Sequence, residues 1–141
     1  MNLSDERIQR FLASRPVVVL ATLQADGSPL AMPMWFLHDA RELAMISVAG
    51  TQKVRNLRRD PRVSVVAEAG GDPRGDAATR GVTVRGRVQF VTDAEGRRTL
   101  ADRFLARYQP SVERLWKGRV MPDDRVAFRI VPERVQSWGL S

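Results

Sequence analysis

The chain has 141 residues, 43% of them hydrophobic and 28% charged, and it contains no cysteine, which excludes disulfide scaffolds, iron–sulfur clusters and thiol nucleophiles. A chain of this length buries enough apolar surface to fold without disulfides or a structural metal, so we expect one domain over residues 1–141. The formal net charge is +7, and 21 of the 23 basic residues are arginine, a balance that suits nucleic acid, a membrane or a phosphorylated small molecule.

The first third of the chain indicates one helix followed by three strands. Ser4 is a good N-cap for a helix over residues 5–13, and Pro16 prevents that helix from continuing. Three segments of extended pattern follow, separated by turn residues, and the first two are typical of a β-hairpin. We expect all three to form an antiparallel meander. They cover residues 17–23, 30–37 and 42–48.

The middle of the chain indicates a short helix and two further strands. Val54 and Leu57 have helical spacing within residues 52–60, Thr51 is the expected N-cap, and Gly50 gives the backbone freedom just before it. Alternating apolar residues predict the strands, and a run rich in glycine, aspartate and alanine predicts a loop between them. The strands cover residues 62–68 and 82–91, and the loop covers residues 69–80.

The last third indicates a longer helix, a short amphipathic piece at 112–116 and a final strand over 125–131. Thr92 and Glu95 have the spacing of a capping box. The helix that follows has one apolar stripe, formed by Leu100, Phe104, Leu105 and Tyr108. Six strands with few helices, mostly in hairpin order, predict a mainly β, α+β fold built on a closed six-stranded antiparallel barrel.

No segment has the length of a membrane span. The most apolar stretch, residues 17–23, is far shorter than the roughly 20 residues that a helix needs to cross a bilayer. Residues 1–15 mix acidic and basic side chains without an apolar core, which is not the pattern of a secretory signal. We therefore expect a cytoplasmic protein with no membrane partner.

The positive charge is concentrated in one segment. Residues 53–62 contain five basic residues and one acid, Asp60, for a local net charge of +4. The other arginines are spread out and mostly have an acid nearby, without the continuous basic stripe and interleaved aromatic residues of a nucleic-acid binder. We expect no nucleic-acid partner.

The inventory of reactive side chains is poor. His38 is the only histidine, so a multi-histidine metal site is excluded and a catalytic triad would depend on this residue alone. We interpret His38, beside Asp39 in a predicted turn, as an exposed turn residue. No acid–base dyad is evident, so an enzyme with this inventory would take its chemistry from a cofactor.

The segment 49–53 is the candidate cofactor site. A glycine ahead of a helix N-terminus lets free backbone N–H groups converge on an anion, and Thr51 and Lys53 add side-chain donors. This arrangement resembles a phosphate cradle, although it has neither the spacing of a P-loop nor that of a Rossmann turn. A solvated lysine in an ordinary first helical turn is the alternative interpretation.

Several runs of residues resemble a known superfamily. Three features in this order resemble the pyridoxamine 5′-phosphate oxidase-like split β-barrels. They are the hairpin with the strand after it, the run Gly50-Thr51-Gln52-Lys53-Val54-Arg55-Asn56-Leu57 with its continuation to Val66, and the run Val84-Arg85-Gly86-Arg87-Val88. Residues 53–63, the strand at 33–36 and the closing segment 134–139 are most similar to the branch that uses the deazaflavin coenzyme F420. The resemblance covers residues 17–139 and implies a split β-barrel that binds a flavin or deazaflavin.

The resemblance also implies a homodimer with two cofactors at the interface between its barrels. In the family a Ser/Thr-x-Lys at the helix start holds the flavin phosphate, which corresponds here to residues 51–53. It assigns no catalytic residue. The cofactor-binding residues that it implies are Met32, Pro33, Met34, Trp35, Ser47, Val48, Gly50, Thr51, Gln52, Lys53, Asn56, Arg58 and Trp138.

One departure from the family pattern favours the deazaflavin. FMN-using members usually have a further basic residue on the strand equivalent to residues 30–37, and this strand has none. Coenzyme F420 has a longer polyanionic tail, for which Arg55, Arg58 and Arg59 are possible receptors. Trp35, Trp138 and Tyr108 are candidates to line the substrate space, although we interpret Tyr108 as a core residue.

Three functions fit the sequence. The first is an F420-dependent oxidoreductase that transfers hydride to or from a small unsaturated substrate, which needs little acid–base help from the protein. The second is an FMN-binding oxidoreductase on the same barrel. The third is a non-catalytic carrier or sensor of a flavin or haem-like ligand.

Overall fold

The fold is known from a computed structural model, which describes residues 2–71, 74 and 78–141. Part of the loop expected at 69–80 lies outside the described residues, at 72–73 and 75–77. No helix in the described part of the chain is long and apolar enough to cross a membrane.

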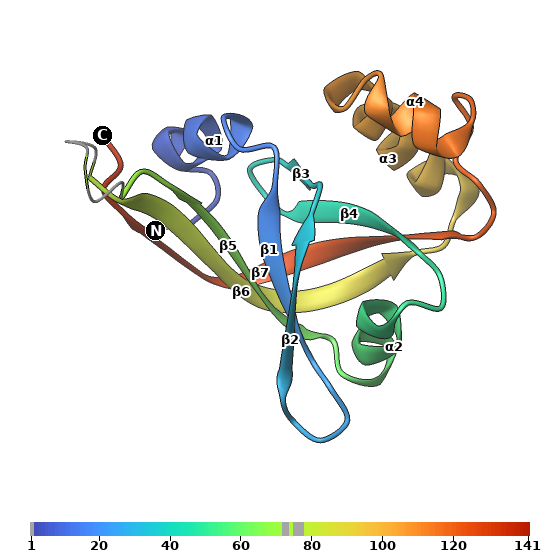
Figure 1. Cartoon of the computed structure of the whole chain (residues 1–141), viewed down its shortest axis with the longest axis horizontal. Helices are drawn as coiled ribbons and strands as arrows, with labels where there is room; N and C mark the ends of the chain where they lie inside the picture. Colours follow the sequence, from blue (N-terminus) through green and yellow to red (C-terminus); the bar gives the residue numbers. More distant parts are fainter. Residues whose placement is uncertain (1, 72–73, 75–77) are drawn as a thin grey trace.

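One antiparallel sheet forms the framework, in the order β2-β1-β5-β6-β7-β4-β3. The sheet curls into a half-barrel, with β1 and β2 crossing in front of β6 and β7 (Figure 1). The mainly β split-barrel fold is therefore confirmed, with seven strands among the described residues instead of six. The strands are β1 Val18–Leu23, β2 Pro29–Met34, β3 Leu37–His38, β4 Leu43–Val48, β5 Arg62–Ala69, β6 Arg80–Val91 and β7 Arg125–Trp138.

The strand expected over residues 30–37 is interrupted at Trp35 and Phe36. The Phe36 N–H donates to the Tyr108 hydroxyl at 3.1 Å, and its carbonyl accepts from Arg107 Nη1 at 2.8 Å. Side chains of a distant helix thus take the backbone groups that a continuous strand would offer to a neighbour. As a result β2 pairs only with β1, and β3 pairs with β4 at the opposite edge of the sheet. The expected meander and closed barrel are wrong in this respect.

The last strand is longer than expected. Beyond Val131, β7 continues to Trp138 and pairs with the first half of β6 after a register shift between Arg85 and Gly86. A Cβ on Gly86 would lie 2.1 Å from the Val131 carbonyl oxygen, so this close approach requires glycine. The irregularity disturbs the alternation from which a strand is predicted.

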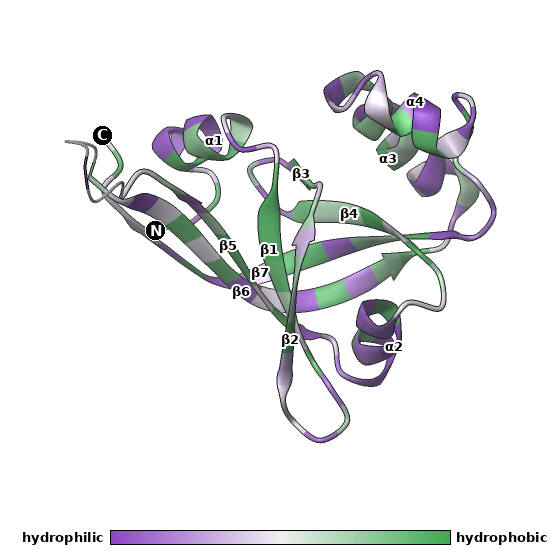
Figure 2. Ribbon diagram, viewed as in Figure 1, coloured by the Kyte–Doolittle hydropathy of each residue, from purple (hydrophilic) through white to green (hydrophobic). Residues whose placement is uncertain are grey.

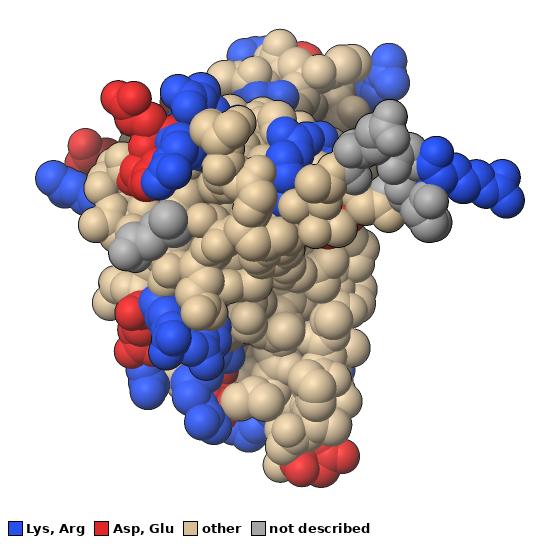
Figure 3. Space-filling model, turned by 90° about the vertical axis from the view of Figure 1, so that its left-hand side faces the viewer, with Lys and Arg blue, Asp and Glu red and all other residues tan. Residues whose placement is uncertain are grey.

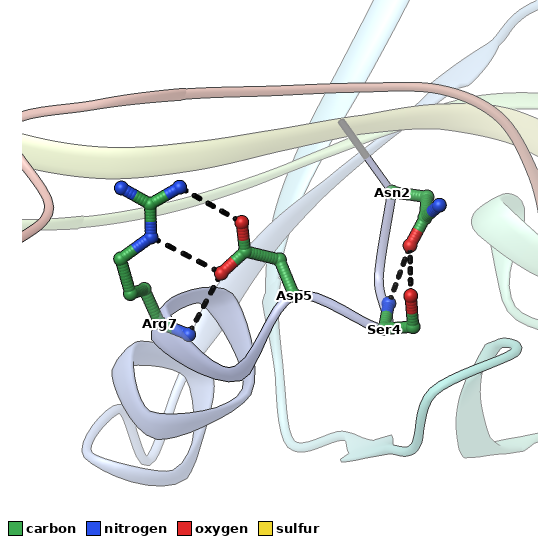
Figure 4. A network of polar contacts seen from close by, with 4 residues as sticks. All are labelled: Asn2, Ser4, Asp5 and Arg7. Carbon is green, nitrogen blue, oxygen red and sulfur yellow. Dashed lines mark hydrogen bonds and ion pairs between the residues drawn. The ribbon is translucent and has the colours of Figure 1, made fainter.

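Four helices connect and cover the sheet: α1 Glu6–Ala13, α2 Gln52–Arg59, α3 Ala94–Arg107 and α4 Ser111–Trp116. The first and third begin one residue later than expected, because an aspartate caps each. Asp5 accepts from the Arg7 N–H at 2.9 Å, whereas Ser4 bonds to Asn2 (Figure 4). Likewise Asp93, not Thr92, accepts from the Gly96 N–H at 2.8 Å. A carboxylate also interacts favourably with the positive end of a helix.

Two apolar clusters stabilise the fold. The larger one lies on the inner face of the half-barrel and includes the buried face of α1 with Phe11 and Leu12. The smaller one packs α3 and α4 against β4 and β7, with Phe104 and Trp116 among its residues. Figure 2 shows the green, hydrophobic stretches of the strands and the largely hydrophilic α2. The second cluster places α3 and α4 at one end of the half-barrel (Figure 1).

Candidate functional site

A cavity of about 510 Å³ lies where the strands β2 and β4 approach the start of α2 and the α3–α4 pair. Strands supply one side of the wall and the two C-terminal helices supply the other. Its lining residues are Val17, Pro33, Met34, Trp35, Ile46, Ser47, Val48, Lys53, Phe104, Val112, Leu115, Trp116 and Arg125.

The wall is largely apolar and contains three aromatic side chains. Trp35 stacks on Tyr108 with ring centroids 4.9 Å apart and planes 11° from parallel, so the indole is held by a helix behind it. Phe104 in turn lies 5.8 Å from Tyr108, and Trp116 is buried in the smaller apolar cluster. Flat, fixed surfaces of this kind suit a planar ring system.

Two cations, Lys53 and Arg125, interrupt the apolar wall, and no carboxylate lies on it. The Lys53 ammonium has no hydrogen-bond or ion-pair partner among residues 2–71, 74 and 78–141, and partial burial lowers its pKa. Arg125 is paired with the exposed Asp124. A bound anion would stabilise the charged form of Lys53, so the cavity combines an apolar surface with an unmatched positive charge.

The start of α2 presents Lys53 to this cavity. Gly50 has φ +83, a conformation that favours glycine, and Thr51 is the N-cap as expected. The Thr51 hydroxyl does not cap the helix but donates to the Val48 carbonyl at 3.0 Å, and the Arg55 guanidinium reaches back to the Gly50 carbonyl. These bonds fix the turn ahead of the helix, and they occupy the hydroxyl that the sequence offers as a phosphate donor.

Other α2 side chains predicted for the site point elsewhere. Asn56 is fully buried, with its Nδ2 donating to Thr22 Oγ1 at 3.0 Å and its Oδ1 accepting from Gln52 Nε2 at 2.8 Å. Arg58 lies over the Phe90 ring at 4.2 Å, and Arg59 donates to the Leu23 carbonyl. Asn56 therefore joins α2 to β1, and of the α2 side chains only Lys53 lies on the cavity wall.

The structure thus brings some of the predicted site residues together and separates others. Those on the wall of the cavity are Pro33, Met34, Trp35, Ser47, Val48 and Lys53. Trp138 lies near the end of β7, where its ring covers Gly81 so closely that a Cβ there would be 2.1 Å away. The predicted residues that do not line the cavity are Met32, Gly50, Thr51, Gln52, Asn56, Arg58 and Trp138.

Sequence reasoning missed the helical half of the wall. Phe104 and Trp116 have the same apolar spacing as the core residues beside them, so their stripe predicts packing and does not distinguish core from cavity. Arg125 was missed because two acids, Asp123 and Asp124, directly precede it, which is the pattern of a solvated ion pair. The missed lining residues are Val17, Ile46, Phe104, Val112, Leu115, Trp116 and Arg125.

Tyr108 packs against the smaller apolar cluster, as expected of a core residue, whereas His38 differs from its sequence interpretation. Tyr108 is half-buried, and its hydroxyl lies 2.9 Å from the Pro16 carbonyl oxygen and 3.1 Å from the Phe36 carbonyl oxygen, so it anchors two chain segments to α3. His38 belongs to β3 and is half-buried, and its Nδ1 lies 2.7 Å from Gln9 Oε1 of α1. It is not an exposed turn residue, and it lies outside the wall of this cavity.

The sequence profile of the pyridoxamine 5′-phosphate oxidase family matches residues 4–139, nearly the whole chain. The chain belongs to this family. The resemblance inferred from the helix start and the strands around it is therefore confirmed, and the half-barrel is the flavin-binding split barrel of this oxidase family.

Solved structures of similar proteins agree with this assignment. A conserved hypothetical protein from Mycobacterium tuberculosis is 33% identical over 96% of this chain and 84% of that chain, with a TM-score of 0.79. An FAD-binding protein from Mesorhizobium loti is 26% identical over 95% of this chain and 93% of that chain, with a TM-score of 0.71. An F420 reductase is 27% identical over 91% of this chain and 94% of that chain, with a TM-score of 0.66.

Proposed function

We propose that this member of the oxidase family is an F420-dependent oxidoreductase that transfers hydride between the reduced deazaflavin and a small unsaturated organic substrate. The observation that carries the proposal is the cavity in which an apolar, aromatic wall meets the unpartnered ammonium of Lys53. The similarity to an F420 reductase, at 27% identity over most of both chains, supports the same function.

The cavity fits a planar redox cofactor with an anionic group. Lys53 would hold the phosphate, together with the first N–H groups of α2, which have no acceptor within the helix. Pro33, Met34 and Trp35 would line the ring system. When bound, the cofactor supplies the hydride chemistry. The part of this chain is to position the ring and the substrate and to exclude water with Phe104 and Trp116.

The charges favour the deazaflavin over the alternative cofactors. The wall offers a terminal phosphate only Lys53 and the Asp124-paired Arg125, and β2 contributes no basic residue to it. The exposed Arg55, in the first turn of α2, suits a longer anionic tail. A haem-like ligand is disfavoured because the single histidine of the chain lies outside this wall.

We further propose that the protein acts as a homodimer and that a second copy covers the outer face of β1, β2 and β5. Val19 is paired across the sheet with Pro33 and with Val66, and cross-strand partners point to the same face. The side chains at these three positions are apolar, and the charged residues on the same side of β5, Arg62 and Glu68, lie near its two ends. On the side of the molecule drawn in Figure 3, charged residues form separate groups with uncharged surface between them. Val17 and Pro33 also line the cavity, so a partner placed here would complete its wall.

Fluorescence titration of the purified protein with F420 and with FMN tests the cofactor. We expect F420 to bind more tightly than FMN, and Lys53→Ala to weaken F420 binding by about 1.5–3 kcal/mol, the range for a charge-assisted hydrogen bond. Arg98→Ala removes one exposed positive charge from α3 and is the matched control, with affinity unchanged. Tight FMN binding without F420 binding would overturn the choice of cofactor.

A turnover assay separates an enzyme from a carrier. Reduced F420 is supplied with a panel of small unsaturated acceptors, and its reoxidation is followed with and without the protein. Enzymatic function predicts acceleration for at least one acceptor, and the acceleration is reduced in the Lys53→Ala variant. Binding of F420 without acceleration of any acceptor would indicate the carrier function.

A further inference from the structure

A second cavity, of about 440 Å³, lies between α1, β3 and α3. It shares no lining residue with the cofactor cavity, and no carboxylate lies on its wall. Three polar and three apolar residues line it, so it can take a charged head and a small apolar portion. The lining residues are Ala13, Leu37, His38, Arg103, Ala106 and Arg107.

Two arginines one turn apart on α3 give this cavity an uncompensated positive charge. Arg107 donates to three backbone carbonyls, those of Phe36, Leu12 and Arg15, at 2.8, 3.0 and 2.7 Å. Arg103 makes one long hydrogen bond, to the His38 carbonyl at 3.4 Å. Within the described part of the chain neither has an ion pair, so both retain N–H groups for a ligand.

The acids nearest to the cavity are engaged elsewhere. Asp39 Oδ1 accepts from the N–H groups of Arg41 and Glu42 within its own turn. The Glu42 carboxylate is paired with Arg129 at 2.8 Å. These carboxylates affect the cavity only through long-range electrostatics, and neither forms an ion pair with Arg103 or Arg107.

Hydrogen bonds around Gln9 fix the tautomer of His38. Gln9 Nε2 donates both of its hydrogens, to the carbonyls of Leu3 and Asp39 at 2.8 Å each, so Gln9 Oε1 can only accept. His38 Nδ1, 2.7 Å from that oxygen, must therefore carry the hydrogen. His38 Nε2 has no partner in the described structure, and no buried side-chain atom there lacks one, so Nε2 is accessible to solvent.

We propose that this cavity is a second ligand site that binds a phosphate group, either free phosphate or a small phosphate monoester, between Arg103, Arg107 and His38. The phosphate oxygens accept from the two guanidinium groups. A phosphate that keeps an O–H group, such as a monoester monoanion or either anion of inorganic phosphate, donates it to the neutral His38 Nε2. Ala13, Leu37 and Ala106 leave an apolar surface for the organic part of a monoester.

Electrostatics gives the site a pH dependence. Burial and the charges of Arg107 and Arg103 lower the pKa of His38 to about 4, against a smaller opposite effect of Asp39. A bound anion offsets the two arginines and raises this pKa, because it favours the imidazolium. By linkage, protonation of His38, which turns Nε2 into a donor to the phosphate, tightens binding as the pH falls through the His38 pKa of the complex.

The single histidine makes the test direct, because its imidazole NMR signals need no assignment. We expect inorganic phosphate to shift these signals saturably at pH 6, and to raise the His38 pKa by about one unit or more. Phenyl phosphate distinguishes the two ligands: tighter binding than that of inorganic phosphate identifies a monoester, and equal binding identifies free phosphate. Sodium chloride at equal ionic strength should leave the signals unchanged.

Substitutions test whether the phosphate-dependent shift of the His38 signals arises in this second cavity. Arg103→Gln should weaken phosphate binding about tenfold or more, because a charge-assisted hydrogen bond is lost, and the single long bond of Arg103 makes misfolding an improbable cause. Arg98→Gln, an exposed position on the same helix, should retain the affinity, and Lys53→Ala should leave the His38 response intact. Loss of the response in Lys53→Ala, unchanged affinity in Arg103→Gln, or equal shifts with chloride would each overturn the proposal.

Discussion

Asn56 is fully buried, and its side-chain amide has three polar contacts, all within the protein. Its bond to Thr22 joins α2 to β1, and Gln52 and Arg59 reach its oxygen from the same helix. In the sequence Asn56 lies one turn from Lys53, which favours a position facing the same ligand. That inference did not hold, because the residue lies on the side of α2 that packs on the sheet and a buried polar group must be satisfied there.

Replacing Asn56 with alanine is therefore expected to affect stability before it affects binding. The change leaves the buried Thr22 hydroxyl without its donor, which costs about 1–3 kcal/mol in the free energy of unfolding. Urea denaturation measures this cost, and the double variant with Thr22→Val should lose less than the sum of the two single changes. Unchanged stability with weakened F420 binding would instead place Asn56 in the cofactor site.

Asp5 makes the first helix sensitive to acid. Hydrogen bonds from the Arg7 side chain and then from its backbone N–H lower the pKa of Asp5 from 3.8 to about 2. Because the folded-state pKa is the lower one, this contribution to stability is complete above about pH 4 and is lost as the pH falls toward about 2. Asp5→Asn keeps a good N-cap but removes the charge, so we expect a flatter fall in stability over this window. The pKa of Asp60 is lowered in the same way by Arg62, and this residue is unchanged in the parent and in Asp5→Asn, so it serves as an internal reference. Identical acid unfolding curves for the two proteins would contradict the assignment.

At the scale of elements, the sequence pattern predicted those strands and helices whose limits depend on interactions between residues close in sequence. The strands β1, β4, β5 and β6 alternate or are β-branched, and each lies within a few residues of its expected range. The break between β2 and β3 could not be predicted in this way, because the groups that cause it, on Arg107 and Tyr108, are 71 and 72 residues away from Phe36 in sequence. The extension of β7 depends on the bulge opposite Gly86, which is likewise a contact between distant segments.

The α3–α4 pair lines one side of the cavity that contains Lys53. Leu115 lines the cavity but is 61% exposed, so its side chain contributes little to the core. If the proposed oxidoreductase function holds, Leu115→Ala should change KM for the substrate several-fold, with stability within about 0.5 kcal/mol of the parent. Leu105→Ala, a buried position in the same helix pair, should instead cost about 2–5 kcal/mol of stability. Steady-state kinetics and thermal unfolding measure the two effects, and an unchanged KM would remove Leu115 from the substrate space.

At the scale of the whole molecule, the basic residues that cluster in the sequence have different surroundings in the structure. Within residues 53–62, Lys53 faces the cavity, while Arg58 lies on Phe90 and Arg62 pairs with Asp60. The density of positive charge along residues 53–62 can be seen in the sequence, because it is a local property, but the sequence could not orient the side chains. Four of the thirteen residues that line the cavity come from α3 and α4, which are distant in sequence from the segment that contains Lys53.

The proposed dimer predicts that one charge on the outer face separates the two copies. Val19→Arg places a guanidinium between Pro33 and Val66, where a second copy would deprive it of water without a carboxylate to pair with. We expect the parent to sediment as a dimer and this variant as a folded monomer with weaker F420 binding, because its cavity lacks the partner's contribution. Val131→Arg makes the same change at another exposed valine, beside the Arg87–Glu133 pair, and should remain dimeric. A parent that sediments as a monomer and still binds F420 would contradict the dimer and leave the cofactor proposal standing.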